Sequence, residues 1–191
     1  MNQLNASNLD LVTLVNDDDE VIGSMDKVEA HRGEGKLHRA ISVFLFSSEG
    51  KLLLQQRSAS KIVGAGQWAN TCCGNVWPSE SYEECAQRRL EDELGITTAQ
   101  LTPVTKFQYF AQCNEEFCER ELDQVFVGRY DGTVKPNSKE VAETRWLTLD
   151  ELEKELSLDS GSESRYVPWL KIMFDTGIIQ TIKEAYAKSR K

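Results

Sequence analysis

Apolar and polar positions alternate along several short stretches of this chain, which is the period of a half-buried β-strand. The first two stretches are separated by a polar turn at residues 16–19, and another pair flanks Ser48-Glu49-Gly50, so both pairs predict hairpins. Strands are predicted at 9–15, 21–23, 37–47, 51–56, 104–110, 122–130 and 141–147.

A helical period replaces this alternation after Ser81. Ser81 and Glu84 have the spacing of a capping box, and Gly95 suits the C-terminal cap, so a helix is predicted between them. The apolar face of that helix consists of Tyr82, Ala86, Leu90 and Leu94. Thr148 and Glu151 repeat the capping pattern at the start of a shorter helix. The later helices are predicted at 148–156, 166–174 and 178–189.

Strands with helices inserted between them predict an α+β or α/β sandwich. The length of 191 residues suits one domain with its own core, spanning residues 1–191. Within that domain we expect an N-terminal hairpin at about 9–25, a core at about 27–157 and C-terminal helices at about 166–189.

Hydrophobic residues make up 40% and charged residues 28% of the chain, as in soluble globular proteins. The net charge of −9 argues against nucleic acid and anionic membranes as partners, although a local basic pocket could bind a small anionic substrate. The five cysteines form no Cys-x-x-Cys motif and MNQLNASNLD has no signal-peptide pattern, so free thiols in a cytoplasmic protein are expected. The longest apolar run, at 41–46, is too short to span a bilayer. A monomer and a small homo-oligomer are both compatible with the sequence.

The helix and the residues before it carry the spacing of a known motif. Glycine, five residues, glutamate, seven residues, arginine and a closing Glu-Leu-Gly-Ile occur at Gly74, Glu80, Arg88 and 93–96. This spacing resembles the Nudix box, which implies the Nudix fold, a mixed central sheet flanked by helices. Nudix hydrolases have metal-binding glutamates where this chain has Arg89 and Asp92. Fewer carboxylates weaken a multi-Mg²⁺ site and arginine binds phosphate, so we expect a box that holds a diphosphate rather than cleaving it.

The segment Asn70-Thr71-Cys72-Cys73-Gly74 resembles the active-site loop of type I isopentenyl-diphosphate isomerases, a branch of the Nudix superfamily. The resemblance implies that Cys73 is catalytic, whereas a free cysteine is otherwise most often a small buried thiol. Cys72 should face the other way and take that buried role. Cys85 should lie on the buried face of the helix, in the protein core.

His31 and His38 flank the turn at 32–36, and without context they would be interpreted as two surface histidines. Glu119 and Glu121 occupy alternate positions, which on a strand point to one face and can converge on one ion; a solvated strand edge is the alternative. In the isomerases, two such histidines and an E-x-E ligate a metal, and the second glutamate also moves a proton, which implies these roles here. The family's third histidine ligand is replaced by Asn75, a weaker partner for Zn²⁺, so Mg²⁺, Mn²⁺ and Zn²⁺ all remain possible for this ion.

The resemblance also implies a diphosphate site. The family binds the diphosphate with two lysines and two arginines, and all four matching positions have the right residue, although each alone would be an ordinary solvated side chain. These positions are Lys27, Arg57, Lys61 and Arg89. Glu93 matches the family glutamate that binds Mg²⁺ on the substrate's diphosphate. Tyr109 and Trp169 match pocket aromatics, whose alternative role is core packing.

The expected activity is the interconversion of isopentenyl diphosphate and dimethylallyl diphosphate, in which one proton is added to an alkene and another is removed. Cys73 and Glu121 would act on opposite faces of this small-molecule substrate, with Trp169 and Tyr109 stabilising the carbocation. Two alternatives remain. One is a Nudix hydrolase that cleaves a nucleoside or other diphosphate, and the other is a catalytically weak binding protein on the same fold.

Overall fold

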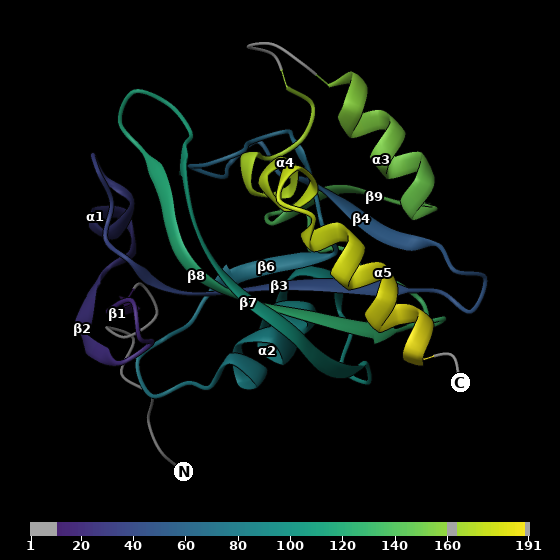
Figure 1. The fold of residues 1–191 in the computed structure, drawn as a ribbon, viewed down its shortest axis with the longest axis horizontal. Coiled ribbons are helices and arrows are strands. Elements are labelled where there is room, and N and C mark those ends of the chain that lie inside the picture. Colours follow the sequence, from purple (N-terminus) through teal and green to yellow (C-terminus); the bar gives the residue numbers. More distant parts are fainter. Residues whose placement is uncertain (1–10, 160–163, 190–191) are drawn as a thin grey trace.

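The computed structural model describes residues 11–159 and 164–189 as a sheet with helices on both faces (Figure 1). The N-terminal two residues of the first predicted strand lie outside the described residues. The elements in chain order are β1 Leu11–Val15, β2 Val21–Asp26, α1 Lys27–His31, β3 His38–Phe46, β4 Leu52–Arg57, β5 Trp68–Ala69, β6 Cys72–Asn75, α2 Tyr82–Leu94, β7 Gln100–Gln112, β8 Cys118–Arg129, β9 Val141–Leu147, α3 Leu149–Leu158, α4 Pro168–Asp175 and α5 Ile178–Ser189.

Strand β3 is the centre of the sheet. It runs parallel to β8 and antiparallel to β6 and β1, while β7 extends the sheet beyond β8 and β9 extends it beyond β4. Helix α2 covers one face, and α4 and α5 cover the other (Figure 1). This mixed sheet between two helical layers confirms the predicted fold class.

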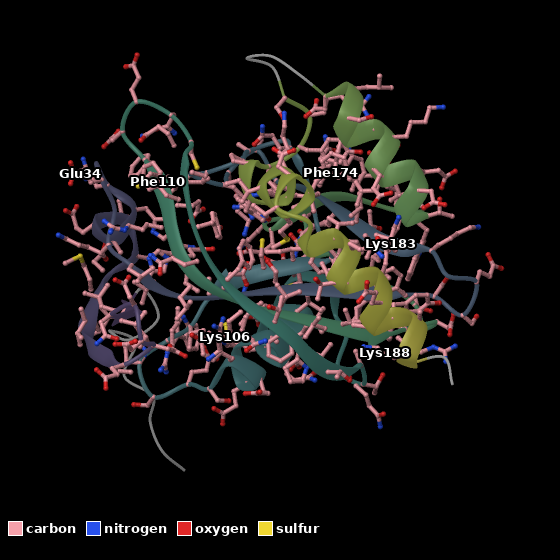
Figure 2. All side chains as sticks on the ribbon, in the orientation of Figure 1. Glu34, Lys106, Phe110, Phe174, Lys183 and Lys188 are labelled. Carbon is pink, nitrogen blue, oxygen red and sulfur yellow. The ribbon has the colours of Figure 1, made fainter. Side chains whose placement is uncertain are left out.

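The apolar run at 41–46 is explained by this position, because β3 is buried on both faces. Ile41, Val43 and Leu45 pack in the core under α2. Phe44 and Phe46 point to the opposite core, which includes α3, α4 and α5. Lys183 of α5, labelled in Figure 2, donates hydrogen bonds to two carboxylates of α3 and ties these two helices together.

The hairpin formed by β3 and β4 opens to admit the segment of residues 70–75. The strands pair beside their turn, at Phe46 and Leu52. Farther from the turn, β3 and β4 are not hydrogen-bonded to each other, and Thr71 bridges them instead. Its Oγ1 accepts from the Leu45 N–H at 2.9 Å and donates to the Leu53 carbonyl at 2.6 Å. The segment continues as β6, which pairs with β3. Cys73 and Gly74, which the resemblance placed in an active-site loop, therefore belong to a strand.

The two capping boxes are confirmed. Ser81 and Thr148 are the N-caps of α2 and α3, each with reciprocal side-chain bonds to the glutamate three residues later. Gly95 ends α2 in the left-handed conformation, with a φ of 65°. The short helix α1 was not predicted, since its five residues offer too little periodicity. No helix within the described ranges has both the length and the apolar character needed to cross a bilayer.

Asp19 fastens the β1–β2 hairpin to the rest of the fold. Its carboxylate accepts from Arg39 Nε at 2.7 Å, from the Tyr82 hydroxyl at 2.9 Å and from Lys106 Nζ at 2.5 Å. Lys106 is labelled in Figure 2. Asp19 also has a φ of 63°, a conformation that aspartate and asparagine tolerate better than most residues. One turn residue therefore connects the hairpin to β3, to the start of α2 and to β7.

We predict that Asp19→Ala lowers the free energy of unfolding by about 1–3 kcal/mol, because three donors lose their shared acceptor and the backbone becomes strained. Asp19→Asn should cost less, since asparagine keeps one acceptor and tolerates the same φ. Urea denaturation measures both, with the exposed neighbour variant Asp18→Ala as the control. Equal stability of Asp19→Ala and Asp18→Ala would contradict this assignment.

Candidate active site

A cavity of about 370 Å³ lies where α1, the start of β1, β6, the tip of the β7–β8 hairpin and α2 approach one another. Most of the sequence-predicted site residues line it. These are Lys27, His31, Arg57, Lys61, Cys73, Asn75, Arg89, Tyr109, Glu119, Glu121 and Trp169. His38 and Glu93 are fully buried and reach the site through their contacts with these lining residues.

Two histidines and two glutamates meet at one end of the cavity. One ligand atom from each of His31, His38, Glu119 and Glu121 lies within 4.8 Å of the others. His31 ends α1 and His38 begins β3, and the turn between them contains two glycines with φ of 63° that fold the chain back. Glu119 and Glu121 occupy alternate positions of β8 and share a face, as the sequence indicated.

The tautomers of both histidines follow from their backbone contacts. His31 Nδ1 lies 2.6 Å from the Lys27 carbonyl, and His38 Nδ1 lies 2.7 Å from the Lys36 carbonyl. A carbonyl oxygen only accepts, so both Nδ1 atoms carry the hydrogen. In the neutral rings, each Nε2 therefore presents a lone pair to the glutamates, the arrangement that metal-binding histidines use.

This donor set fits a divalent cation. His31 Nε2 lies 3.0 Å from Glu119 Oε2, and this buried oxygen has no hydrogen-bond partner in the described part of the chain. Two atoms with lone pairs can face each other at this distance only with a proton or a cation between them. Burial opposes a charged ring, but the Glu119 carboxylate outweighs this effect and raises the pKa of His31. Two imidazole nitrogens and two carboxylates would satisfy a divalent metal in place of that proton.

Asn75 lies inside this cluster. Its Nδ2 is 3.0 Å from His38 Nε2 and 3.0 Å from Glu121 Oε1, so the amide donates to two of the four potential ligands. The amide orientation is fixed by these acceptors, and a bound cation would instead favour the carbonyl oxygen turned inward. Asn75 therefore contacts one histidine and one glutamate of the cluster, and its role as a metal ligand stays a prediction.

Cys72 and Cys73 face opposite sides of β6. Cys73 lines the cavity, and Arg57 Nη1 lies 3.6 Å from its sulfur. Desolvation raises the pKa of the Cys73 thiol to about 12 in spite of this guanidinium, so the thiol keeps its proton at neutral pH. Cys72 is fully buried against α2, where its thiol also donates to Glu93 Oε2 at 3.2 Å. Cys85 is buried in the same core.

Besides the Cys73 thiol, the Glu121 carboxylate is a second group in the cavity that could transfer a proton. The Tyr109 hydroxyl donates to Glu121 Oε2 at 2.5 Å. Burial alone would raise the pKa of Glu121, but His38 and Tyr109 stabilise the carboxylate and lower its pKa to about 2. Trp169 lines the cavity together with Cys73, and its indole N–H donates to Asn70 Oδ1 at 3.1 Å. Arg57 lies over its ring, 5.2 Å from the centroid.

The opposite part of the cavity is basic. Arg89 and Lys61 both contact the buried Glu93, which also accepts from Gln55 Nε2 at 2.8 Å. Burial disfavours the charged form of Glu93 and would raise its pKa, but the charges of Arg89 and Lys61 outweigh burial and lower the pKa. Lys27 lines the cavity and keeps contact with solvent; desolvation and the charges of Lys61 and Arg89 lower its pKa.

Gly74 lets Arg89 enter this region. A Cβ at position 74 would lie 2.7 Å from Arg89 Cγ, so a side chain there would displace the arginine. Glycine is therefore needed at position 74 because the Arg89 side chain packs against its Cα, and not because of its backbone conformation, since its φ is not positive. Arg89 Nε is buried without a hydrogen-bond partner among the described residues, which leaves a donor for an anion.

Sequence reasoning missed Glu140, which lines the cavity, and the buried Asp123 beyond the histidine–glutamate cluster. Glu140 accepts from both Lys61 and Arg89, but it lies far from them in sequence, next to β9. Asp123 continues the Glu119 and Glu121 face of β8, and the same alternation could have revealed it. Ser42 Oγ donates to Asp123 at 2.7 Å. Burial and the nearby Glu121 carboxylate raise the pKa of Asp123 well above its usual value.

Known proteins resemble this chain in sequence and in fold. A NUDIX domain model matches residues 36–170. The isopentenyl-diphosphate Delta-isomerase of Burkholderia multivorans is 41% identical over 162 residues, which cover 85% of this chain and 89% of that protein. The isopentenyl-diphosphate Delta-isomerase of Nocardia farcinica is 43% identical over 160 residues, covering 83% and 89%. A crystal structure of DR0079 from Deinococcus radiodurans shares the fold, with a TM-score of 0.71, 24% identity and coverage of 87% and 98%.

We predict that Asn75→His raises the affinity of the histidine–glutamate cluster for Zn²⁺ or Mn²⁺ by about one to two decades, because imidazole is a better ligand than an amide. The measurement is a calorimetric titration of metal-stripped protein with each ion. Asn75→Ala is the matched control and should bind no more tightly than the original chain. If Asn75→His and the original chain bind Zn²⁺ equally, residue 75 lies outside the coordination shell.

Proposed function

The chain belongs to the isopentenyl-diphosphate Delta-isomerase family of NUDIX-domain proteins, and we propose on that premise that it interconverts isopentenyl and dimethylallyl diphosphate. The observation that carries the proposal is the position of Cys73. Its thiol lines the same cavity as Glu121 and Tyr109, 3.6 Å from the Arg57 guanidinium that also contacts the Trp169 ring. Relatives that share this family name support the substrate class, a small diphosphate.

The reaction needs one group that gives a proton and another that accepts one. Cys73 holds its proton at neutral pH, while Glu121 is ionised and hydrogen-bonded to Tyr109. We assign the first proton transfer to Cys73 and the second to Glu121, which act from β6 and β8 on either side of β3. Proton exchange with solvent then resets the pair before the next turnover.

The carbocation between the two transfers must be kept from water. Trp169 is 3% exposed and Tyr109 is 6% exposed, so the aromatic part of the cavity wall is itself packed away from solvent. The Arg57 guanidinium lies 5.2 Å from the centroid of the Trp169 ring, a cation–π contact that shows this ring stabilising a positive charge at the cavity wall.

The diphosphate would be held at the basic part of the cavity. Arg57, Lys61, Arg89 and Lys27 supply the positive charge, and Arg89 Nε is a buried donor with no described partner. Binding energy from this charged end orients the small hydrocarbon between Cys73 and Glu121. Mg²⁺ on Glu93 would neutralise part of the substrate's charge. A second divalent ion on His31, His38, Glu119 and Glu121 would fix the Glu121 carboxylate.

A diphosphate hydrolase fits this site less well. Arg89 stands where the hydrolytic box has a metal-binding glutamate, and it is engaged with Glu93 and Glu140. The Asp92 side chain is 49% exposed, and its Oδ2 lies 3.8 Å from both Arg88 Nη1 and Arg89 Nη1. The helix therefore offers one buried carboxylate, Glu93, for a metal on the cavity side. Hydrolytic metal sites normally use several.

We predict that the protein with Mg²⁺ converts isopentenyl diphosphate into an acid-labile allylic diphosphate without releasing phosphate or pyrophosphate. Cys73→Ala should reduce this rate by about 10²–10⁴-fold, the range of a lost acid–base group. Acid lability of the product and a phosphate assay distinguish the two outcomes. Release of pyrophosphate or phosphate would assign the chain to the hydrolases.

The matched control is the neighbouring thiol. Cys72→Ala removes a hydrogen bond to Glu93 and some packing, so it should lower stability by about 1–2 kcal/mol and leave most of the turnover. Circular dichroism shows whether both variants are folded. Equal loss of turnover in two folded variants would mean that Cys73 is not the proton-transfer residue.

A further inference from the structure

We propose that Glu140 makes binding of the diphosphate depend on a divalent cation. The inference rests on the proposed function, because it concerns the site assigned there to the diphosphate. It adds a residue that selects the metal-bound form of the ligand over the metal-free form.

Glu140 occupies the donors that a diphosphate would use. Its Oε2 accepts from Arg89 Nη2 at 3.0 Å and from Lys61 Nζ, and its side chain is 29% exposed at the wall of the cavity. Lys61 and Arg89 lower the pKa of Glu140 to about 2 against the effect of burial, so the group is ionised at neutral pH. The basic part of the cavity thus contains a fixed negative charge.

The backbone holds this charge in place. The Glu140 carbonyl accepts from the Ser58 N–H at 3.0 Å, and the Glu140 N–H donates to the Asn137 carbonyl at 2.8 Å. The neighbouring Lys139 carbonyl accepts from the hydroxyls of Ser58 and Ser60, at 2.7 Å and 3.0 Å. The carboxylate can therefore turn on its side chain, but the main chain keeps it beside the cavity.

Glu93 and Glu140 respond differently when an anion takes the shared donors. Glu93 keeps Gln55 Nε2 at 2.8 Å and the Cys72 thiol at 3.2 Å on its other oxygen. For the Glu140 carboxylate, Lys61 and Arg89 are the only partners found among the described residues. If diphosphate oxygens replace it there, Glu140 becomes an unpaired carboxylate next to another anion, which is unfavourable.

A divalent cation on the diphosphate reverses this effect. Without the cation, Glu140 and the diphosphate repel each other across a few ångströms of partly desolvated protein. With it, the displaced carboxylate has a positive partner, either directly or through a bound water. The same residue therefore disfavours the free diphosphate and tolerates or favours the metal complex.

The test is calorimetric titration with inorganic pyrophosphate, once with excess Mg²⁺ and once with EDTA. The quantity compared is the ratio of the two dissociation constants, without Mg²⁺ over with Mg²⁺. Glu140→Gln should lower this ratio by about tenfold or more, mainly through tighter binding of metal-free pyrophosphate. Glu140→Asp keeps the charge and should keep a ratio close to that of the original chain.

Glu143→Gln is the matched control, because Glu143 is an exposed residue of β9 that neutralises to the same amide. It should leave the ratio unchanged, and Glu140→Ala serves as a second neutral variant if Glu140→Gln does not fold. A purely structural role would weaken binding equally with and without Mg²⁺, and an unchanged ratio in a folded Glu140→Gln overturns the inference. If the original chain binds pyrophosphate in neither condition, the proposed diphosphate site fails, and this inference fails with it.

Discussion

The site depends on the opening of the β3–β4 hairpin by the segment of residues 70–75. Two strands joined by a short turn would normally pair along their length, and separating them leaves backbone groups without partners. Thr71 satisfies groups of both strands with one hydroxyl, and β6 restores pairing along β3. Because this segment is a strand, successive side chains point to opposite faces, and this determines which residues reach the cavity. Cys73 and Asn75 face the cavity, while Cys72 and Gly74 face helix α2.

Much of the charge in the site is buried, and this is stable only because each charge is compensated. The histidine–glutamate cluster needs a cation or protons between facing lone pairs, and Glu93 is surrounded by four donors from four different residues. Such networks fix side chains in one geometry before substrate arrives, which reduces the ordering required on binding. They also make single deletions costly, since the remaining partner stays buried without compensation.

The sequence predicted those features that local patterns determine. The caps of α2 and α3 and the strands over 37–47 and 141–147 follow from spacing and hydrophobicity alone. Cys73, the histidines and the glutamate pair were found because a family motif marks them. Glu140 had no such signal, because its partners are 51 and 79 residues away and only the folded sheet brings them together. Strand β6 was mistaken for a loop because its glycine suggested flexibility, whereas the structure uses it for contact with Arg89.

Arg89 shows how one substitution in a shared motif can change what the fold does. A glutamate at this position of α2 would add a carboxylate beside Glu93 and favour a cluster of Mg²⁺ ions. The guanidinium instead binds Glu93 and Glu140, and its buried Nε has no partner among the described residues, so this helix face presents positive charge where the hydrolytic box presents carboxylates. Gly74 is then required to make room for the longer side chain. The histidine–glutamate cluster at the other end of the cavity is built from α1, β3 and β8 and uses no residue of α2, so the two ends could change independently.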